Sequence, residues 1–336
     1  MSIVDVAQTA DRIVLVTERY EGESDAFAAW SSTDGRSWER AQVFPAGQRI
    51  LALTAGGPGF AAAGFDAAGA VVWTSADGLD WAPVSDPSLR DGVINTLVAT
   101  DSGLVGFGWR SDHDGQAIWT SPDGSEWLAA TNETGVHVAS GLQAVGAYDG
   151  RAVAFVSPGE GEATEIWETS GRAEWTQTGT LEGSASPSIV AGGARGWIAL
   201  GSNLAWASPD GRLWSRGFPG PDVDADVIVD DAGFIAVGFV GSLPNETCGD
   251  QRPFSGHTWT SADGRRWQQS QHTDEFETSM VTRLLVVDRT LVGYGQRIQT
   301  MVDDNMDIGR WTAPLPDDSR PADASDEASD FVSCGG

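Results

Sequence analysis

The stretch Trp73-Thr74-Ser75-Ala76-Asp77-Gly78-Leu79-Asp80-Trp81 places two tryptophans around a Ser-x-Asp-Gly centre. The same frame, with Ser, Asp and Gly at the same places, recurs at Trp30–Trp38, Trp119–Trp127, Trp206–Trp214 and Trp259–Trp267. A sixth copy, Trp167–Trp175, keeps both tryptophans but has lost the other three residues. The six frames use 12 of the 15 tryptophans, so the chain is built from a repeated unit.

The centre of each frame has the composition of a tight turn. Ser75 suits the first place and Gly78 the place that needs a left-handed backbone, which predicts a three-residue hairpin loop with a bulge. In such a loop the two tryptophans lie roughly opposite each other, where an aromatic pair adds about 0.5–1.5 kcal/mol. The repeated aspartates are expected to accept hydrogen bonds from N–H groups of their own turns, as structural and not catalytic groups. They are Asp34, Asp77, Asp123, Asp210 and Asp263.

The pattern Ser-x-Asp-Gly-x-x-Trp after an aromatic residue resembles the Asp-box (BNR) repeat of sialidase-like β-propellers. Five clean copies and one degenerate copy cover most of the chain. The family pattern has one more residue between Asp and Trp, so this chain carries a shortened variant. In that family the repeat lies between the third and fourth strands of a blade, on the face away from the ligand site. The resemblance therefore implies a fold and favours a non-catalytic member.

Short apolar strands precede most of these frames. An example is Ile50-Leu51-Ala52-Leu53, which is followed by the turn Gly57-Pro58-Gly59 and a second strand. Four strands in about 40–50 residues are typical of a propeller blade. We predict an all-β, seven-bladed β-propeller with four-stranded antiparallel blades, and six blades as the alternative. The blades are expected at about 1–45, 46–88, 89–134, 135–180, 181–218, 219–274 and 275–316.

The last residues, 317–336, have a different composition. They are rich in Pro, Ser, Asp and Ala, which predicts an acidic, solvated tail. Phe331-Val332-Ser333 within it is a candidate fourth strand that would close the last blade.

The chain is strongly acidic. It has 20 arginines, no lysine and 48 acidic residues, so its net charge is 20 − 48 = −28. Nucleic acid and anionic membranes attract cationic patches, so we expect neither as a partner. No apolar run approaches the roughly 20 residues of a membrane span, and Met1-Ser2-Ile3-Val4-Asp5 does not begin a signal peptide. We expect a monomer that is extracellular or on the cell surface, with the cytoplasm of a halophile as the alternative.

Two cysteines, Cys248 and Cys334, are the only ones in the chain. We predict a disulfide between them, which implies an oxidising compartment. The four histidines show no ligand spacing, so no metal or other cofactor is expected. Asp303-Asp304-Asn305-x-Asp307 offers oxygen ligands for calcium, but it lacks the spaced Gly and terminal Glu of a known calcium loop.

The face opposite the Asp turns is the expected binding face, because long loops join the second and third strands there. Arginine, carboxylate and aromatic side chains on those loops suit a polar ligand or a protein. The candidates are Trp109, Arg110, Asp112, His113, Asp114, Asp250, Arg252, Phe254, Arg297, Asp303, Asp304 and Asp307. We expect a non-enzymatic binding or scaffold protein that presents these loops to a protein or glycan partner.

The alternative is a sialidase-like glycoside hydrolase. That family clamps a carboxylate with three arginines and uses a tyrosine, backed by a glutamate, as its nucleophile. Tyr148 falls on the wrong face, whereas Tyr20 and Tyr294 belong to blades that adjoin when the ring closes. Nearby polar residues are Arg19, Glu21 and Arg297. The family's N-terminal Arg-Ile-Pro signature is absent, which favours binding over hydrolysis.

Overall fold

A computed structural model describes most of the chain, and every structural statement below concerns the described residues. They are 2–21, 24–57, 59–111, 115–130, 133–159, 161–170, 174–181, 186–201, 204–217, 226–231, 233–240, 255–269, 279–297 and 307–314.

The strands form seven separate antiparallel sheets, each made from consecutive strands of the chain. The first sheet contains β1 (Ser2–Gln8), β2 (Ile13–Glu21), β3 (Ser24–Ser32) and β4 (Glu39–Val43). The second contains β5 (Arg49–Gly56), β6 (Gly59–Asp66), β7 (Gly69–Ser75) and β8 (Ala82–Pro83). The third contains β9 (Gly92–Thr100), β10 (Gly103–Arg110), β11 (Gly115–Ser121) and β12 (Leu128–Ala129). The fourth contains β13 (Leu142–Tyr148), β14 (Arg151–Val156), β15 (Glu165–Thr169) and β16 (Thr176–Thr180).

The remaining sheets follow the same plan. The fifth contains β17 (Ile189–Gly193), β18 (Gly196–Gly201), β19 (Leu204–Ser208) and β20 (Ser215–Arg216). The sixth contains β21 (Asp226–Asp230), β22 (Gly233–Val240), β23 (Ser255–Ser261) and β24 (Gln268–Gln269). The seventh has three described strands, β25 (Ser279–Val287), β26 (Thr290–Arg297) and β27 (Asp307–Pro314).

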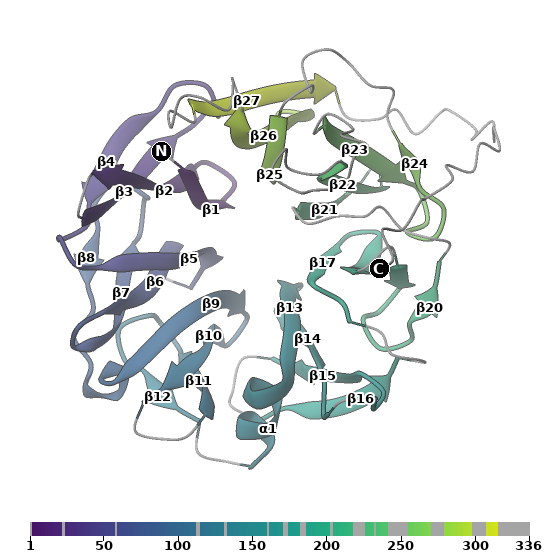
Figure 1. The fold of residues 1–336 in the computed structure, drawn as a ribbon, viewed down its shortest axis with the longest axis horizontal. Coiled ribbons are helices and arrows are strands. Elements are labelled where there is room, and N and C mark those ends of the chain that lie inside the picture. The colour runs from purple at the N-terminus through teal and green to yellow at the C-terminus, as the bar shows by residue number, and fades with distance from the viewer. Residues whose placement is uncertain are drawn as a thin grey trace, which may run out of the picture.

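The sheets are arranged radially around one axis (Figure 1). The first strand of every sheet is innermost, and the seventh sheet lies beside the first and completes the ring. The chain is therefore a seven-bladed β-propeller, as the repeat predicts, and the six-bladed alternative is wrong. The candidate outer strand Phe331-Val332-Ser333 lies outside the described residues.

The hydrophobic core is divided among the interfaces between neighbouring blades. Between the first two blades, Val14 and Phe44 pack with Ile50, Phe60 and Trp73. Corresponding clusters follow around the ring, and each combines residues of two adjacent blades. Because a strand presents alternate side chains to its two faces, each blade packs against both of its neighbours.

The inner strands share an irregularity near their beginnings. In β1, β5, β9, β13 and β25 one extra residue shifts the register with the second strand. Such a bulge changes the direction in which the following side chains point. In β1 and β25 the residues directly after the bulge are Asp5 and Arg283, whose roles are described below.

Two short helices interrupt the β structure in the described part of the chain, although the sequence pattern predicts no helix. A 3-10 helix, η1 (Pro87–Leu89), begins after Asp86, whose side chain accepts a hydrogen bond from the backbone N–H of Ser88. The α-helix α1 (Glu133–Gly141) joins the third and fourth blades. Its Val138 and Ala139 are buried in the cluster between these blades, so tertiary packing overrides a weak local helix propensity.

The expected pairing of the two tryptophans within a frame is wrong. Trp73 pairs with Pro83 across the hairpin, two residues beyond Trp81, and Trp119 pairs in the same way with Ala129. The loop between strands is therefore longer than the predicted three residues. Both tryptophans of a frame instead contribute to one interface with the preceding blade, as Trp119 and Trp127 do.

Candidate functional site

The antiparallel order assigns every loop to one of two faces. The turns between first and second strands and the tryptophan hairpins between third and fourth strands lie at one end of each blade, which we call the hairpin face. The loops between second and third strands and the connections between blades lie at the other end, which we call the loop face.

Hydrogen bonds of the repeated Ser, Asp and Gly shape the hairpins. The Ser75 hydroxyl accepts a bond of 2.8 Å from the N–H of Gly78. Oδ1 of Asp77 accepts bonds of 2.9 and 3.0 Å from the N–H groups of Leu79 and Asp80. All five clean copies repeat the Gly-to-Ser bond at 2.8–2.9 Å, with Gly φ angles of 63–84°. The aspartates thus hold their own loops.

The titration of these aspartates fits that structural role. Bonds from the N–H groups of Ser37 and Arg36 lower the pKa of Asp34 to about 2. The pKa of Asp77 and that of Asp210 are lowered mainly by the same kind of backbone bond. A general acid or base works best with a pKa near the working pH, so these carboxylates are poorly suited to proton transfer at neutral pH.

Each hairpin also packs against the preceding blade. A Cβ on Gly78 would lie 2.7 Å from Cγ2 of Val14 in the first blade. A Cβ on Gly264 would lie 2.9 Å from Cβ of Ala207 in the fifth blade. The glycine is therefore required twice, for its positive φ and for close packing between blades. The sequence predicts the positive φ of this glycine but does not predict its close packing against the preceding blade.

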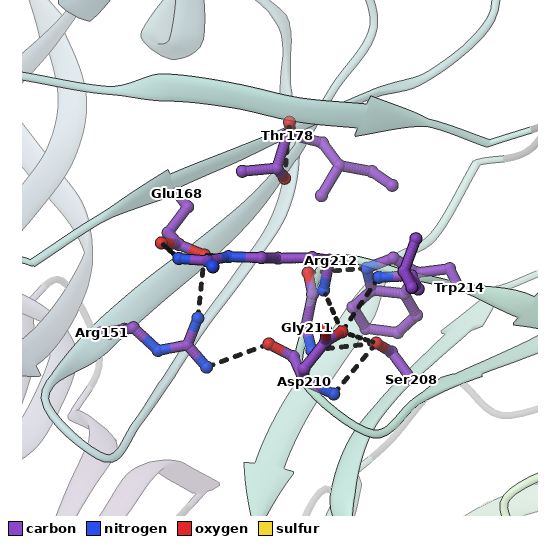
Figure 2. A network of polar contacts seen from close by, with 10 residues as sticks. Arg151, Glu168, Thr178, Ser208, Asp210, Gly211, Arg212 and Trp214 are labelled. Atoms are coloured by element: carbon purple, nitrogen blue, oxygen red, sulfur yellow. Dashed lines mark hydrogen bonds and ion pairs between the residues drawn. The ribbon is translucent and has the colours of Figure 1, made fainter.

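An ion-pair network joins the fourth and fifth blades on the hairpin face (Figure 2). Glu168 accepts bonds from Arg212, at 2.6 and 2.9 Å, and from Arg151, at 2.8 Å. Arg151 also donates to the carbonyl of Asp210 at 3.0 Å. A hydrogen bond from Arg212 lowers the pKa of Glu168, and the charge of Arg151 acts in the same direction, while burial opposes them. The network connects the blades and leaves this carboxylate ionised.

A second set of charges lies on the innermost strands, where the sequence analysis places no functional residue. Arg283 donates to Oδ1 of Asp5 at 3.1 Å and to the carbonyl of Val4 at 2.8 Å. Oδ2 of Asp5 accepts a bond of 2.9 Å from the N–H of Leu53 in the second blade. Asp226 reaches the N–H of Leu284 in the seventh blade in the same way. In the sequence, a charged residue in an otherwise apolar first strand, such as Asp5, is the only signal that could have predicted these contacts.

The tyrosine considered as a nucleophile has a structural position. Tyr294 is 1% exposed, and its hydroxyl donates a bond of 2.9 Å to the carbonyl of Gly35 in the first-blade hairpin. Burial raises the pKa of Tyr294 to about 12, the opposite of what nucleophilic activation requires. Tyr148 is 38% exposed on the hairpin face, and Tyr20 lies in β2. Tyr294 therefore has a structural contact, whereas Tyr20 and Arg297 are placed only by their positions in β2 and β26.

The structure describes part of the predicted binding face. Trp109, at the end of β10, is 46% exposed, and Arg110 beside it is half-buried. Arg297 ends β26 and lies opposite Asp307, the first residue of β27. The other candidates lie outside the described residues, so no grouping is assigned to them: Asp112, His113, Asp114, Asp250, Arg252, Phe254, Asp303 and Asp304.

A hollow of about 210 Å³ opens beside this region, at the loop-face end of the second blade. Val72, Trp73 and Leu89 provide apolar lining, and Arg90 is exposed at its edge. Gln48 accepts a bond of 3.0 Å from Nε1 of Trp73. Among the described residues no hydrogen bond or ion pair occupies the guanidinium of Arg90.

The two carboxylates in the lining of the hollow have internal hydrogen-bond partners. The Asp66 carboxylate accepts bonds from Nε2 of Gln48 at 3.3 Å and from the N–H of Ala68 at 2.8 Å. The Asp86 carboxylate accepts bonds from the N–H groups of Ser88 at 2.8 Å and Trp127 at 2.9 Å. No local sequence motif predicts the hollow, because three separated segments form it.

Neither a metal centre nor a membrane segment is found in the described part of the chain. No group of three or more His, Cys, Asp or Glu side chains there is arranged to hold a metal ion. The structure contains no described helix with the length and apolar character needed to cross a bilayer. The proposed calcium ligands and both cysteines lie outside the described residues, apart from Asp307 at the start of β27.

Known structures share the whole fold with this chain. A structure of YCF48 bound to D1 peptide is similar with a TM-score of 0.57 and 17% identity, over 96% of this chain and 94% of that one. A putative 6-phosphogluconolactonase from Bacteroides uniformis gives 0.56 and 9% identity, over 91% and 97% of the two chains. The propeller domain of the Trilobed protease from Pyrococcus furiosus gives 0.52 and 10% identity, over 96% and 98%.

These similarities establish the architecture alone, because proteins of this fold perform unrelated functions. No family model and no curated protein matches the chain. Membership of the Asp-box family therefore stays a prediction from the repeat.

Proposed function

We propose that this propeller is a non-enzymatic binding protein whose loop face takes an extended segment of a partner protein. The observation that carries the proposal is the 210 Å³ hollow, with exposed Arg90 at its edge and exposed Trp109 in the neighbouring blade. Pockets for whole small molecules usually measure about 300–1,000 Å³, so this hollow suits a single side chain.

Backbone contacts connect the hollow with the tryptophan. The N–H of Asp91 donates to the carbonyl of Ala68 at 3.3 Å, and the N–H of Ser111 donates to the carbonyl of Asp91 at 2.9 Å. Through Asp91, these two hydrogen bonds connect the loop at the hollow with the end of β10. Exposed tryptophan and arginine side chains are the types that most often anchor protein interfaces. The peptide complex of the similar YCF48 propeller shows that this architecture can bind a polypeptide, and it supports the proposal by analogy.

A hydrolase is less well supported. Its best tyrosine, Tyr294, is buried and hydrogen-bonded to Gly35, and the repeated aspartates build hairpins on the opposite face. The net charge of −28 further favours a partner with basic residues, whose association would be faster at low salt.

Selection from a peptide display library, with a glycan array and a glycoside turnover screen in parallel, tests the proposal. We expect selected peptides to lose about tenfold or more in affinity on Trp109→Ala or Arg90→Ala. The control Leu213→Ala removes a side chain that is 74% exposed on the hairpin face, and it should leave the affinity unchanged. Binding to glycans alone, turnover of a glycoside, or peptide binding that ignores both loop-face variants would overturn the proposal.

A further inference from the structure

Among the described strands, none is shared between the first and last blades, where the ring closes. All four strands of the first blade come from residues 2–43, and the three described strands of the seventh come from residues 279–314. No described strand of one blade pairs with the other. The contacts that the structure describes across this junction, which we call the seam, are made by side chains with one another and with the neighbouring backbone.

The apolar cluster that the structure describes at the seam is small. Its buried cluster contains four described residues, Ile13, Leu285, Val292 and Tyr294. The corresponding cluster between the first and second blades contains twelve. Burial of apolar area is the main stabilising contribution to such interfaces, so the described seam receives less of it.

Polar contacts supplement this small cluster at two levels. On the innermost strands, Arg283 bridges to Asp5 and to the carbonyl of Val4. Towards the hairpin face, Tyr294 bonds the carbonyl of Gly35, and its ring meets the ring of Trp38 edge-on at 5.7 Å. The seam thus uses the hairpin of the first blade as the other interfaces use theirs.

The inner contacts continue beyond the seam. Asp226 of the sixth blade binds the seventh through the N–H of Leu284, and Asp5 binds the second blade through the N–H of Leu53. Blades six, seven, one and two are therefore connected in series by three charged side chains. Loss of the Arg283 contact would interrupt this series at the seam.

We infer that the propeller opens first at the seam, and that Arg283 and Tyr294 form a latch that keeps the ring closed. Local opening occurs where buried apolar contacts are fewest, and it is faster there than global unfolding. The latch residues contribute nothing to the lining of the hollow of the second blade, so the latch is independent of the proposed binding function.

Hydrogen exchange of the full chain, followed by mass spectrometry, tests the latch. In the wild type, amides of β1, β25 and β26 should exchange faster than those of β5, β6 and β9. Arg283→Met keeps most of the side-chain stem, and Tyr294→Phe removes a single oxygen. Each should accelerate exchange at the seam by about tenfold or more, while β13 to β20 change little.

The matched control is Arg151→Met. Arg151 also bridges two blades, and its side chain is 27% exposed compared with 31% for Arg283. It should accelerate exchange in the fourth and fifth blades and leave the seam unchanged. Equal protection of all blades in the wild type would overturn the latch, as would uniform acceleration around the ring by the seam variants. If Arg283→Met does not fold, Tyr294→Phe decides the question in the same way.

Discussion

The carboxylate of Asp226 reaches from the sixth blade to the seventh, where its Oδ2 accepts a hydrogen bond of 2.8 Å from the N–H of Leu284. Burial raises the pKa of Asp226 to about 6 from the usual 3.8, although Arg283 and the N–H donors oppose the rise; Asp5 adds to it. The folded protein therefore binds this proton more tightly than the unfolded chain between about pH 4 and pH 6. Linkage predicts that the stabilisation from protonated Asp226 is present below about pH 4 and is lost as the pH rises through about 6.

Asp226→Asn should remove this pH dependence. The amide oxygen still accepts the bond from Leu284, and the buried charge is gone. One pKa unit corresponds to about 1.4 kcal/mol, so the free energy of unfolding at pH 7.5 should rise by at most about 3 kcal/mol. The rise should be smaller than this limit, because the side chain keeps some contact with solvent. Urea titrations at pH 4 and pH 7.5 measure it.

The control for net charge is Asp11→Asn, which removes a negative charge from an exposed turn. Its difference from the wild type should be small at both pH values. The Asp226→Asn difference should be large at pH 7.5 and close to zero at pH 4. An equal difference at the two pH values would contradict the linkage.

The packing of hairpins on neighbouring blades predicts unequal effects of two glycine substitutions. Gly78 and Gly47 both have positive φ, +74° and +87°, so Ala at either position is strained by about 1 kcal/mol or more. A Cβ on Gly78 would also meet Val14 at 2.7 Å, whereas nothing lies within 4 Å of a Cβ on Gly47. Overpacking typically adds about 1–3 kcal/mol.

Gly78→Ala should therefore destabilise the protein by about 1–3 kcal/mol more than Gly47→Ala. Denaturant unfolding of both variants, compared at constant m-value, gives the difference. If the two alanines destabilise equally, the hairpin glycine is required by its backbone angle alone and does not hold the blades together.

How far the sequence predicts this fold depends on the distance over which each feature is determined. The turn contacts of Ser75, Asp77 and Gly78 lie within six residues, so local chemistry identifies them. Their repetition at blade-length spacing then gives the architecture. The pairing of Trp73 with Pro83 depends on the full loop length, which a turn motif does not determine.

The unpredicted features depend on tertiary contacts between residues that are distant in the sequence. Arg283 and Asp5 are 278 positions apart, and only the assembled ring brings them together. The hollow combines Gln48, Trp73 and Arg90 from separate segments of the second blade and its connections. Loop length alone predicts the candidates on the loop face, and the described part of the structure brings only Arg297 and Asp307 into register. Local sequence pattern and composition contain no information about such long-range tertiary contacts.

The network in Figure 2 predicts an order of effects for two substitutions. The side chain of Glu168 is 15% exposed and holds two arginines, whereas that of Arg212 is 55% exposed. Exposed ion pairs contribute about 0–1 kcal/mol, but removing the charge shared by two guanidinium groups leaves both without their carboxylate partner. Glu168→Gln should therefore destabilise the protein more than Arg212→Ala. Thermal unfolding in low and high salt measures both, and the reverse order would show that Glu168 is not the centre of the network.

The predicted disulfide between Cys248 and Cys334 is open to a direct chemical test, since both residues lie outside the described part of the chain. In the sequence, Cys248 belongs to the connection between β22 and β23. Protein isolated without reductant should yield one linked peptide pair on mass mapping, and reduction should lower stability by about 2–4 kcal/mol. Alkylation of both thiols in denaturant without prior reduction would exclude the bond, and with it the argument for an oxidising compartment.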